Sequence, residues 1–166
     1  MNAAPIFGVT TIMSFIVFSI VAYLYILPII RNSSRENALI ALIIPHAFRF
    51  EGLSFLVPGV VSPSLEPAFA VPAAYGDFGA SILGIIAIVA LSARWRWAIP
   101  LVWVFNIWGF ADIVDAVYHG VIFGIAASSG SLGALFFIPT VFVPLLMITH
   151  GLIFWQLLRS RQLVHS

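Results

Sequence analysis

Residues 7–30 read FGVTTIMSFIVFSIVAYLYILPII, a run of 24 residues without a charged side chain. A helix needs about 20 mainly apolar residues to cross the hydrocarbon core of a bilayer, so this run is long enough to span it. It is too long for the apolar region of a secretory signal peptide, and no basic residue precedes it. We therefore interpret residues 7–30 as a transmembrane helix that is retained in the protein.

Four further stretches are long and apolar enough to be transmembrane helices, namely residues 38–57, 75–93, 98–118 and 132–158. The chain is 62% hydrophobic and only 8% charged, which is far from the composition of a soluble domain. The sequence thus predicts an all-α integral membrane protein in the cell or inner membrane, with the lipid bilayer around it. We expect a five-transmembrane-helix bundle that forms a single membrane domain over residues 1–166.

The composition also excludes several classes of function. There is no cysteine, which rules out disulfides and thiolate metal sites, and no lysine, which rules out a retinal or pyridoxal Schiff base. The net charge of +1 predicts no nucleic-acid partner. Neither H-E-x-x-H nor G-x-S-x-G occurs, so the sequence leaves open whether the protein is an enzyme.

The arginines predict the orientation of the bundle. With five passes, six of the seven arginines fall on one side of the membrane: Arg31, Arg35, Arg94, Arg96, Arg159 and Arg161. Cytoplasmic segments of membrane proteins carry an excess of basic residues. The sequence therefore predicts that the N-terminus lies outside and the C-terminus in the cytoplasm.

Prolines and caps predict where the helices begin and end. We expect an ordered outer loop over residues 58–74, because it contains Pro58, Pro63, Pro67 and Pro72. Asp77 would then cap a shorter third helix, and Ser33 and Glu36 have the spacing of a capping box before the second. The sequence does not decide whether the fourth span continues through Ala127.

Small residues form a stripe along the third predicted span. Gly76, Ala80 and Gly84 recur every four residues, so another helix backbone can approach this face closely. We interpret the stripe mainly as a packing surface within the bundle. It is also a candidate contact for a homo-oligomer or for a larger membrane complex.

Eight polar side chains fall inside the predicted spans: His46, Arg49, Glu51, Asn106, Asp112, Asp115, Thr149 and His150. A charge at the bilayer centre costs about 2.5–3.5 kcal/mol on insertion scales, so these groups must find partners. At about 1.5 Å per residue, His46, Asn106 and His150 come to similar depths in an inner layer. The charged groups and His119 make a middle-to-outer layer.

Helical phase selects the partners within these layers. Trp108, Asp112, Asp115 and His119 form one stripe down the fourth span, beside Gly109. Arg49 shares a face with His46 and is the expected partner of Asp112 or Asp115. Glu51 lies about 160° from Arg49 around a helix, so it must face another helix, a polar pocket or a proton.

These residues predict an ionisable pocket between the second, fourth and fifth spans. Arg49 could hold the anionic head of a small hydrophobic or amphipathic ligand, or the carboxylates could carry protons; binding and transport are both open. The candidate ligand-binding residues are His46, Arg49, Glu51, Asn106, Trp108, Asp112, Asp115 and His150. A simpler interpretation is a buried ion pair that fixes helix register.

Three other functions remain open on the sequence alone. His46 and His150 could be the axial ligands of a b-type haem. Asp112, Asp115 and His119 could hold the metal ion of a membrane hydrolase, although a nearby arginine would repel it. The protein could also be an accessory subunit of a membrane complex. The sequence does not otherwise identify a cofactor.

Overall fold

The computed structural model describes residues 3–162, and all regular elements in this range are helical. Five helical segments are long and apolar enough to cross a membrane, as the sequence predicts. In chain order they are α1 (Ala4–Val21) with η1 (Ala22–Ile26) and α2 (Leu27–Arg31), α3 (Arg35–Ala47) with η2 (Phe48–Leu56), α4 (Pro67–Ser92), α5 (Ala98–Ile122), and η4 (Ile138–Phe142) with α6 (Val143–Gln162). A short 3₁₀ helix, η3 (Ser129–Phe136), connects α5 to η4.

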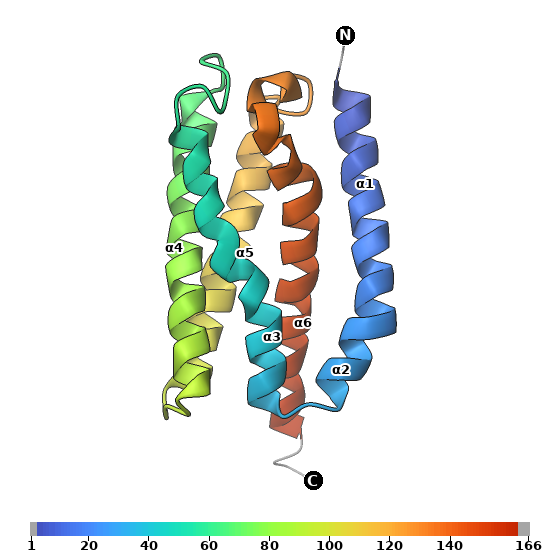
Figure 1. Ribbon diagram of the computed structural model, residues 1–166, viewed down its shortest axis with the longest axis vertical. Helices are drawn as coiled ribbons and strands as arrows, with labels where there is room; N and C mark the ends of the chain where they lie inside the picture. The colour runs from blue at the N-terminus through green and yellow to red at the C-terminus, as the bar shows by residue number, and fades with distance from the viewer. Residues whose placement is uncertain (1–2, 163–166) are drawn as a thin grey trace.

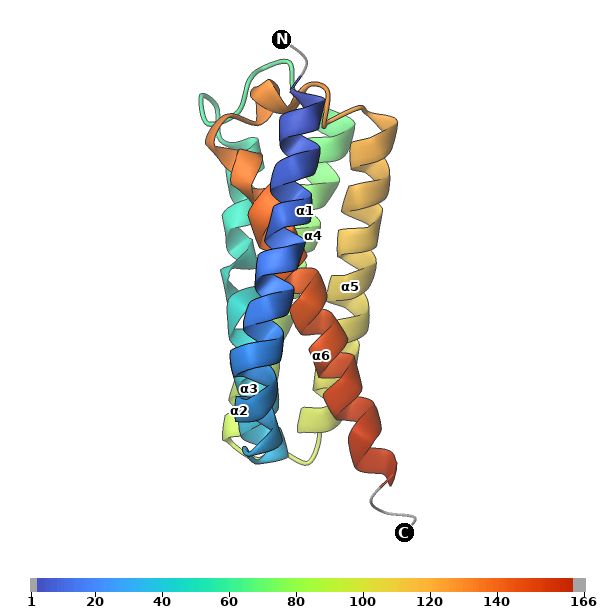
Figure 2. The same cartoon turned by 90° about the vertical axis from the view of Figure 1, so that its right-hand side faces the viewer.

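The five segments lie along one long axis, and consecutive segments run in opposite directions (Figure 1). α4 packs against α3, η2 and α5 in the body of the bundle. α1 lies on the outside, along α6 and η4, and none of its side chains is buried (Figure 2). One face of the bundle is therefore covered only by a loosely packed helix.

The helices change between α, π and 3₁₀ geometry close to prolines. The π-helical turn η1 directly precedes the segment with Pro28, and the π-helical turn η4 contains Pro139. α3 contains Pro45 and continues from Phe48 as the 3₁₀ helix η2. Proline removes a backbone hydrogen bond, and a wider or tighter turn absorbs the resulting distortion. The polar residues of the second span thus lie where the helix changes geometry.

The third span begins earlier than predicted. α4 starts at Pro67, with the Glu66 side chain accepting a hydrogen bond from the Ala68 amide at 3.3 Å. Proline suits the first helical position, and Pro72 is accommodated one turn further on at the cost of one hydrogen bond. The predicted loop over residues 58–74 is therefore too long, and Asp77 lies inside the helix instead of capping it.

The structure decides one boundary that the sequence left open, and two other predicted boundaries are wrong. α5 ends at Ile122 and does not continue through Ala127. The last span begins at Ile138 and not at residue 132, because Gly133 has a non-helical backbone with φ of +55°. The cap of α3 is Ser34, whose Oγ accepts from the Asn37 amide at 3.3 Å, one residue later than the predicted capping box.

Two apolar clusters fill the bundle on either side of the charged residues. The first joins α3, α4, α5 and α6 through residues such as Ile43, Phe105 and Ile153, each 0% exposed. The second lies where η2, the start of α4 and η3 meet, and contains Phe55 and Leu132. Buried apolar residues thus lie on both sides of the polar layer along the bundle.

The small-residue stripe lies inside the chain. Ala80 is 0% exposed, a Cβ on Gly84 would contact Phe105 of α5 at 3.3 Å, and one on Gly76 would meet Asp112 of α5. The stripe allows α4 and α5 to approach closely, which is its packing interpretation. Packing against α5 is enough to explain the stripe, and association with a second chain remains a prediction.

The orientation can be tested with single cysteines, because the chain has no native cysteine. We call the end with Arg31, Arg94 and Arg96 the arginine end, and the end with the segments 57–66 and 123–137 the loop end. Exposed Ser64 and Ser128 lie at the loop end, and exposed Asn32 lies at the arginine end.

We expect Ser64→Cys and Ser128→Cys to react with a membrane-impermeant maleimide added to sealed cells. Asn32→Cys should react only after the membrane is permeabilised, because basic residues favour the cytoplasmic side. The measurement is the labelled fraction of each variant. The opposite labelling pattern would show that the N-terminus faces the cytoplasm.

Candidate functional site

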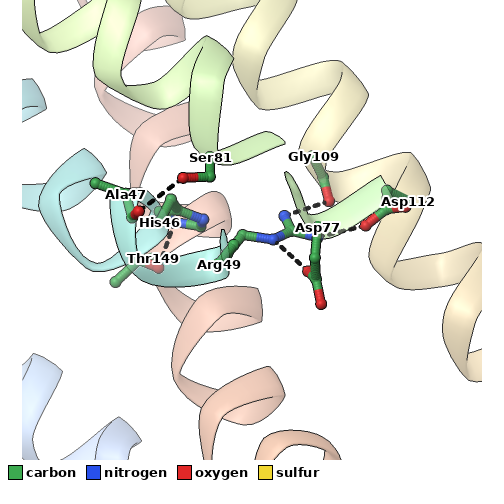
Figure 3. A network of polar contacts seen from close by, with 8 residues as sticks. All are labelled: His46, Ala47, Arg49, Asp77, Ser81, Gly109, Asp112 and Thr149. Atoms are coloured by element: carbon green, nitrogen blue, oxygen red, sulfur yellow. Dashed lines mark hydrogen bonds and ion pairs between the residues drawn. The ribbon is translucent and has the colours of Figure 1, made fainter. Parts of the chain in front are cut away.

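Arg49 of η2 reaches between α4 and α5 and contacts a carboxylate on each (Figure 3). Its Nε donates to Asp77 Oδ1 at 2.7 Å, and its Nη2 donates to Asp112 Oδ2 at 2.5 Å. Nη1 donates to the Gly109 carbonyl at 3.0 Å. The Arg49 side chain is 0% exposed, against 17% for Asp77 and 15% for Asp112. We call these three side chains the charged cluster.

The two carboxylates lie at the same depth in the bundle. Asp77 is ten residues from the start of α4, and Asp112 is ten residues from the end of α5. At 1.5 Å per residue, each is about 15 Å from the loop end. The antiparallel arrangement of α4 and α5 therefore places both in the middle third of helices that are 26 and 25 residues long.

Glycines make room for the charged cluster. A Cβ on Gly76 would lie 1.6 Å from Asp112 Oδ1, and one on Gly52 would lie 2.6 Å from Asp77 Oδ2. A Cβ on Gly109 would lie 3.0 Å from Arg49 Nη1. Real Cβ atoms do not approach neighbours this closely without displacement of the surrounding atoms, so the cluster depends on hydrogen in place of a side chain at these positions.

A layer of histidines lies beside the charged cluster. The rings of His46 and His150 are stacked obliquely, with centroids 4.1 Å apart. His46 Nε2 lies 2.9 Å from Thr149 Oγ1, and His150 Nδ1 lies 2.7 Å from Asn106 Oδ1. The depth estimate predicted that His46, Asn106 and His150 would meet, and the structure brings them together.

Hydrogen bonding assigns the proton on His150. The Asn106 amide nitrogen donates to the His150 carbonyl, so the amide oxygen is the acceptor and His150 Nδ1 carries the proton. His150 Nε2 is then an unprotonated acceptor, and it is buried without a hydrogen-bond partner. His150 Nε2 lies 3.1 Å from the point where Gly109 would carry a Cβ. Arg49 Nη1 lies 3.0 Å from the same point. The two groups therefore lie near the same point beside Gly109.

The structure changes the predicted partners of Arg49. Asp112 is a partner as the helical phase predicted, but Asp115 is exposed and pairs with His119 at 3.1 Å. The second carboxylate is Asp77, which sequence reasoning assigned to a helix cap. A signal was present: Gly76 and Asp77 interrupt an otherwise apolar run that is long enough to begin at Pro67. The charged groups thus come from three spans, including the third.

Two other candidate residues lie apart from the cluster. Glu51 is exposed while Arg49 is 1% exposed, so the two diverge as the helical phase predicted. Trp108 is 55% exposed on the surface of α5 and does not line a buried pocket around Arg49.

The haem alternative does not fit the two histidines. Iron between two axial imidazoles, with bonds of about 2 Å on each side, would put the coordinating nitrogens alone about 4 Å apart and the ring centres farther. The ring centroids of His46 and His150 are only 4.1 Å apart, and each ring already contacts a polar partner. No room for a porphyrin remains between them.

The metal alternative is not supported either. Asp112 is paired with Arg49, whereas Asp115 is paired with His119 one turn further along α5. Within residues 3–162, no group of three acidic, histidine or cysteine side chains is arranged to hold a metal ion.

The chain belongs to a protein family described as a domain of unknown function (DUF8737), whose model matches residues 6–158. No curated protein matches the chain, and no solved structure matches it. The family match covers all five helical segments, so the charged cluster and the histidine layer both lie within the family domain.

Proposed function

We propose that this multi-pass membrane protein binds and releases a proton at the charged cluster. The observation that carries the proposal is the charge balance: one guanidinium faces two carboxylates, so the ionised cluster of Arg49, Asp77 and Asp112 has a net charge of −1. An uncompensated charge in the middle of a membrane costs several kcal/mol. One bound proton makes the cluster neutral, which provides a second, energetically accessible state.

A purely structural role is a weaker explanation of the same contacts. A register lock between two helices needs one buried ion pair, which Arg49 and Asp112 already supply. Asp77 adds a second carboxylate and removes charge neutrality. Ionisable groups inside membrane helices mark functional sites more often than packing contacts.

The proton interpretation also suits the site better than a ligand with an anionic head. All three nitrogens of the Arg49 guanidinium donate to groups of the protein itself, and the side chain is 0% exposed. An anion would have to displace a carboxylate from it. A proton needs no such space.

Polar groups of α5 support exchange with the loop end. Asp115 and His119 follow Asp112 on the same face of α5, at spacings of three and seven residues, and their side chains are 55% and 31% exposed. Toward the arginine end, the cluster is followed by buried apolar residues such as Phe105 and Ile43. We infer that protons enter and leave through Asp115 and His119.

His150 provides a further acceptor next to the cluster. Its Nε2 lies near Arg49 Nη1 beside Gly109 and has no hydrogen-bond partner. A proton on this nitrogen would lie beside a guanidinium, so the carboxylates are the preferred site in the resting state.

Infrared spectroscopy tests the proposal directly. Lowering the pH should produce the C=O stretch of a protonated carboxyl group in the purified protein, and Asp112→Asn or Asp77→Asn should remove part of that band. Either substitution leaves Arg49 one carboxylate and makes the cluster neutral without a proton. Glu66→Gln is the matched control, because it removes a carboxylate at the helix cap. A band that is unchanged in both aspartate variants would exclude the cluster as the proton site.

A further inference from the structure

We propose that a groove beside α1 binds a lipophilic organic cation, with the Glu51 carboxylate as its counter-ion. The groove is distinct from the charged cluster, and the proposal does not depend on proton binding there. Its support comes from the shape and lining of the groove, from the surroundings of Glu51 and from the loose packing of α1.

The groove lies between α1, η2 and the η3–η4 segment and has a volume of about 630 Å³. This is within the range of pockets that hold drug-sized molecules, about 300–1,000 Å³. Its walls are almost entirely apolar, with aromatic rings from three separate elements: Phe18, Phe50, Phe137 and Phe142. Aromatic faces attract organic cations through their ring quadrupoles, as well as apolar groups through contact.

Glu51 is the single charged residue in the lining of this groove. Among residues 3–162, no hydrogen bond or ion pair to its carboxylate is formed. Glu51 lies five residues before the end of η2, which at about 2 Å per residue of 3₁₀ helix is about 10 Å below the loop end. A carboxylate at this depth, in an apolar groove, needs a cation that the protein does not supply.

The chemistry of the groove selects one class of occupant. Arg49 is already shared by two carboxylates and points toward α4 and α5 (Figure 3). A neutral lipid chain would fill the apolar walls but leave Glu51 without a partner. An anion would be repelled. A molecule with an apolar body and one positive charge matches both features.

The position of α1 gives such a molecule a way in. α1 passes alongside the η3–η4 segment on the outside of the bundle (Figure 2), and it has no buried side chain. Phe50 and Phe137 are 47% and 62% exposed, so the groove opens on the side of the bundle. In a membrane this opening faces the lipid, where lipophilic cations concentrate.

A pair of probes with the same shape and opposite charge tests the proposal. Purified protein in neutral detergent should bind tetraphenylphosphonium more tightly than tetraphenylborate, by tenfold or more, because the Glu51 carboxylate attracts one and repels the other. Glu51→Gln should reduce this preference to the smaller part that the aromatic rings supply, while the apolar walls still bind both probes. Glu66→Gln, which removes one carboxylate outside the groove, should bind as the wild type does.

Leu53→Trp provides a second variant, because it fills the groove without changing its charge. It should weaken the binding of both probes, and its elution as a single peak in size exclusion would show that it is folded. Equal affinity of the wild type for the two probes, or an undiminished preference in Glu51→Gln, would overturn the proposal. The infrared band of the charged cluster should persist in Glu51→Gln. The infrared measurement therefore tests the proton site, and probe binding tests the groove independently of it.

Discussion

Replacing Arg49 with leucine is expected to lower the free energy of unfolding by about 3–5 kcal/mol. The substitution leaves the Asp77 and Asp112 carboxylates together in the middle of the bundle without their shared cation. It also leaves the Gly109 carbonyl without its donor from Arg49. The loss should appear as a large fall in the melting temperature of the protein in detergent.

Charge-neutral variants separate the loss of charge balance from the loss of packing. Arg49→Leu combined with Asp77→Asn and Asp112→Asn keeps the shape of both acidic side chains and removes their charges. This triple variant should recover much of the lost stability, because no unpaired charge remains.

Arg49→Leu with Asp112→Asn alone should recover less than the triple variant, since Asp77 stays ionised without a partner. If the cluster only fixes helix register, the triple variant keeps every function of the protein. If it handles protons, the triple variant is stable but loses that function, together with the part of the carboxyl band that Asp77 and Asp112 contribute. A melting temperature of Arg49→Leu equal to that of the wild type would contradict the ion pairs themselves.

The second large effect is expected for Gly76→Ala. The added Cβ would lie 1.6 Å from Asp112 Oδ1, so α4 and α5 must separate or the carboxylate must leave Arg49. Inserting one methyl group into a tightly packed interior typically costs about 1–3 kcal/mol. Here the displaced group is half of an ion pair, so we expect a value at the upper end of this range.

Gly79→Ala is the matched control on the same helix. Its Cβ would have no neighbour closer than Trp108 Nε1 at 3.6 Å, which is an ordinary contact. Alanine is also the better helix former, so this variant should be unchanged or slightly more stable.

Combining Gly76→Ala with Asp112→Ala should cost less than the sum of the two single substitutions, because the clash disappears with the carboxylate. Thermal unfolding of the four proteins gives this comparison. Strict additivity of the two substitutions would show that Gly76 and Asp112 are not in contact.

The sequence by itself determined the class of the fold and narrowed the principal ionic contact to two candidates. Mainly apolar runs of about 20 residues can satisfy their backbone in lipid only as helices, so the number of spans follows from composition and length. Helical phase also narrowed the partner of Arg49 to Asp112 or Asp115, because a buried guanidinium needs a carboxylate, and the structure pairs it with Asp112. The divergence of Glu51 from Arg49 followed from the same periodicity.

Only the tertiary structure decided which second carboxylate Arg49 contacts and where the groove lies. Asp77 pairs with Arg49 because α4 begins at Pro67. Prolines occur both in loops and in the first turns of helices, so they do not show from the sequence whether a segment is a loop or the start of a helix. The groove depends on how far α1 stands from η2 and η4, which is set by packing between segments distant in sequence. Local patterns report what each segment buries, but they carry no information on which buried faces meet.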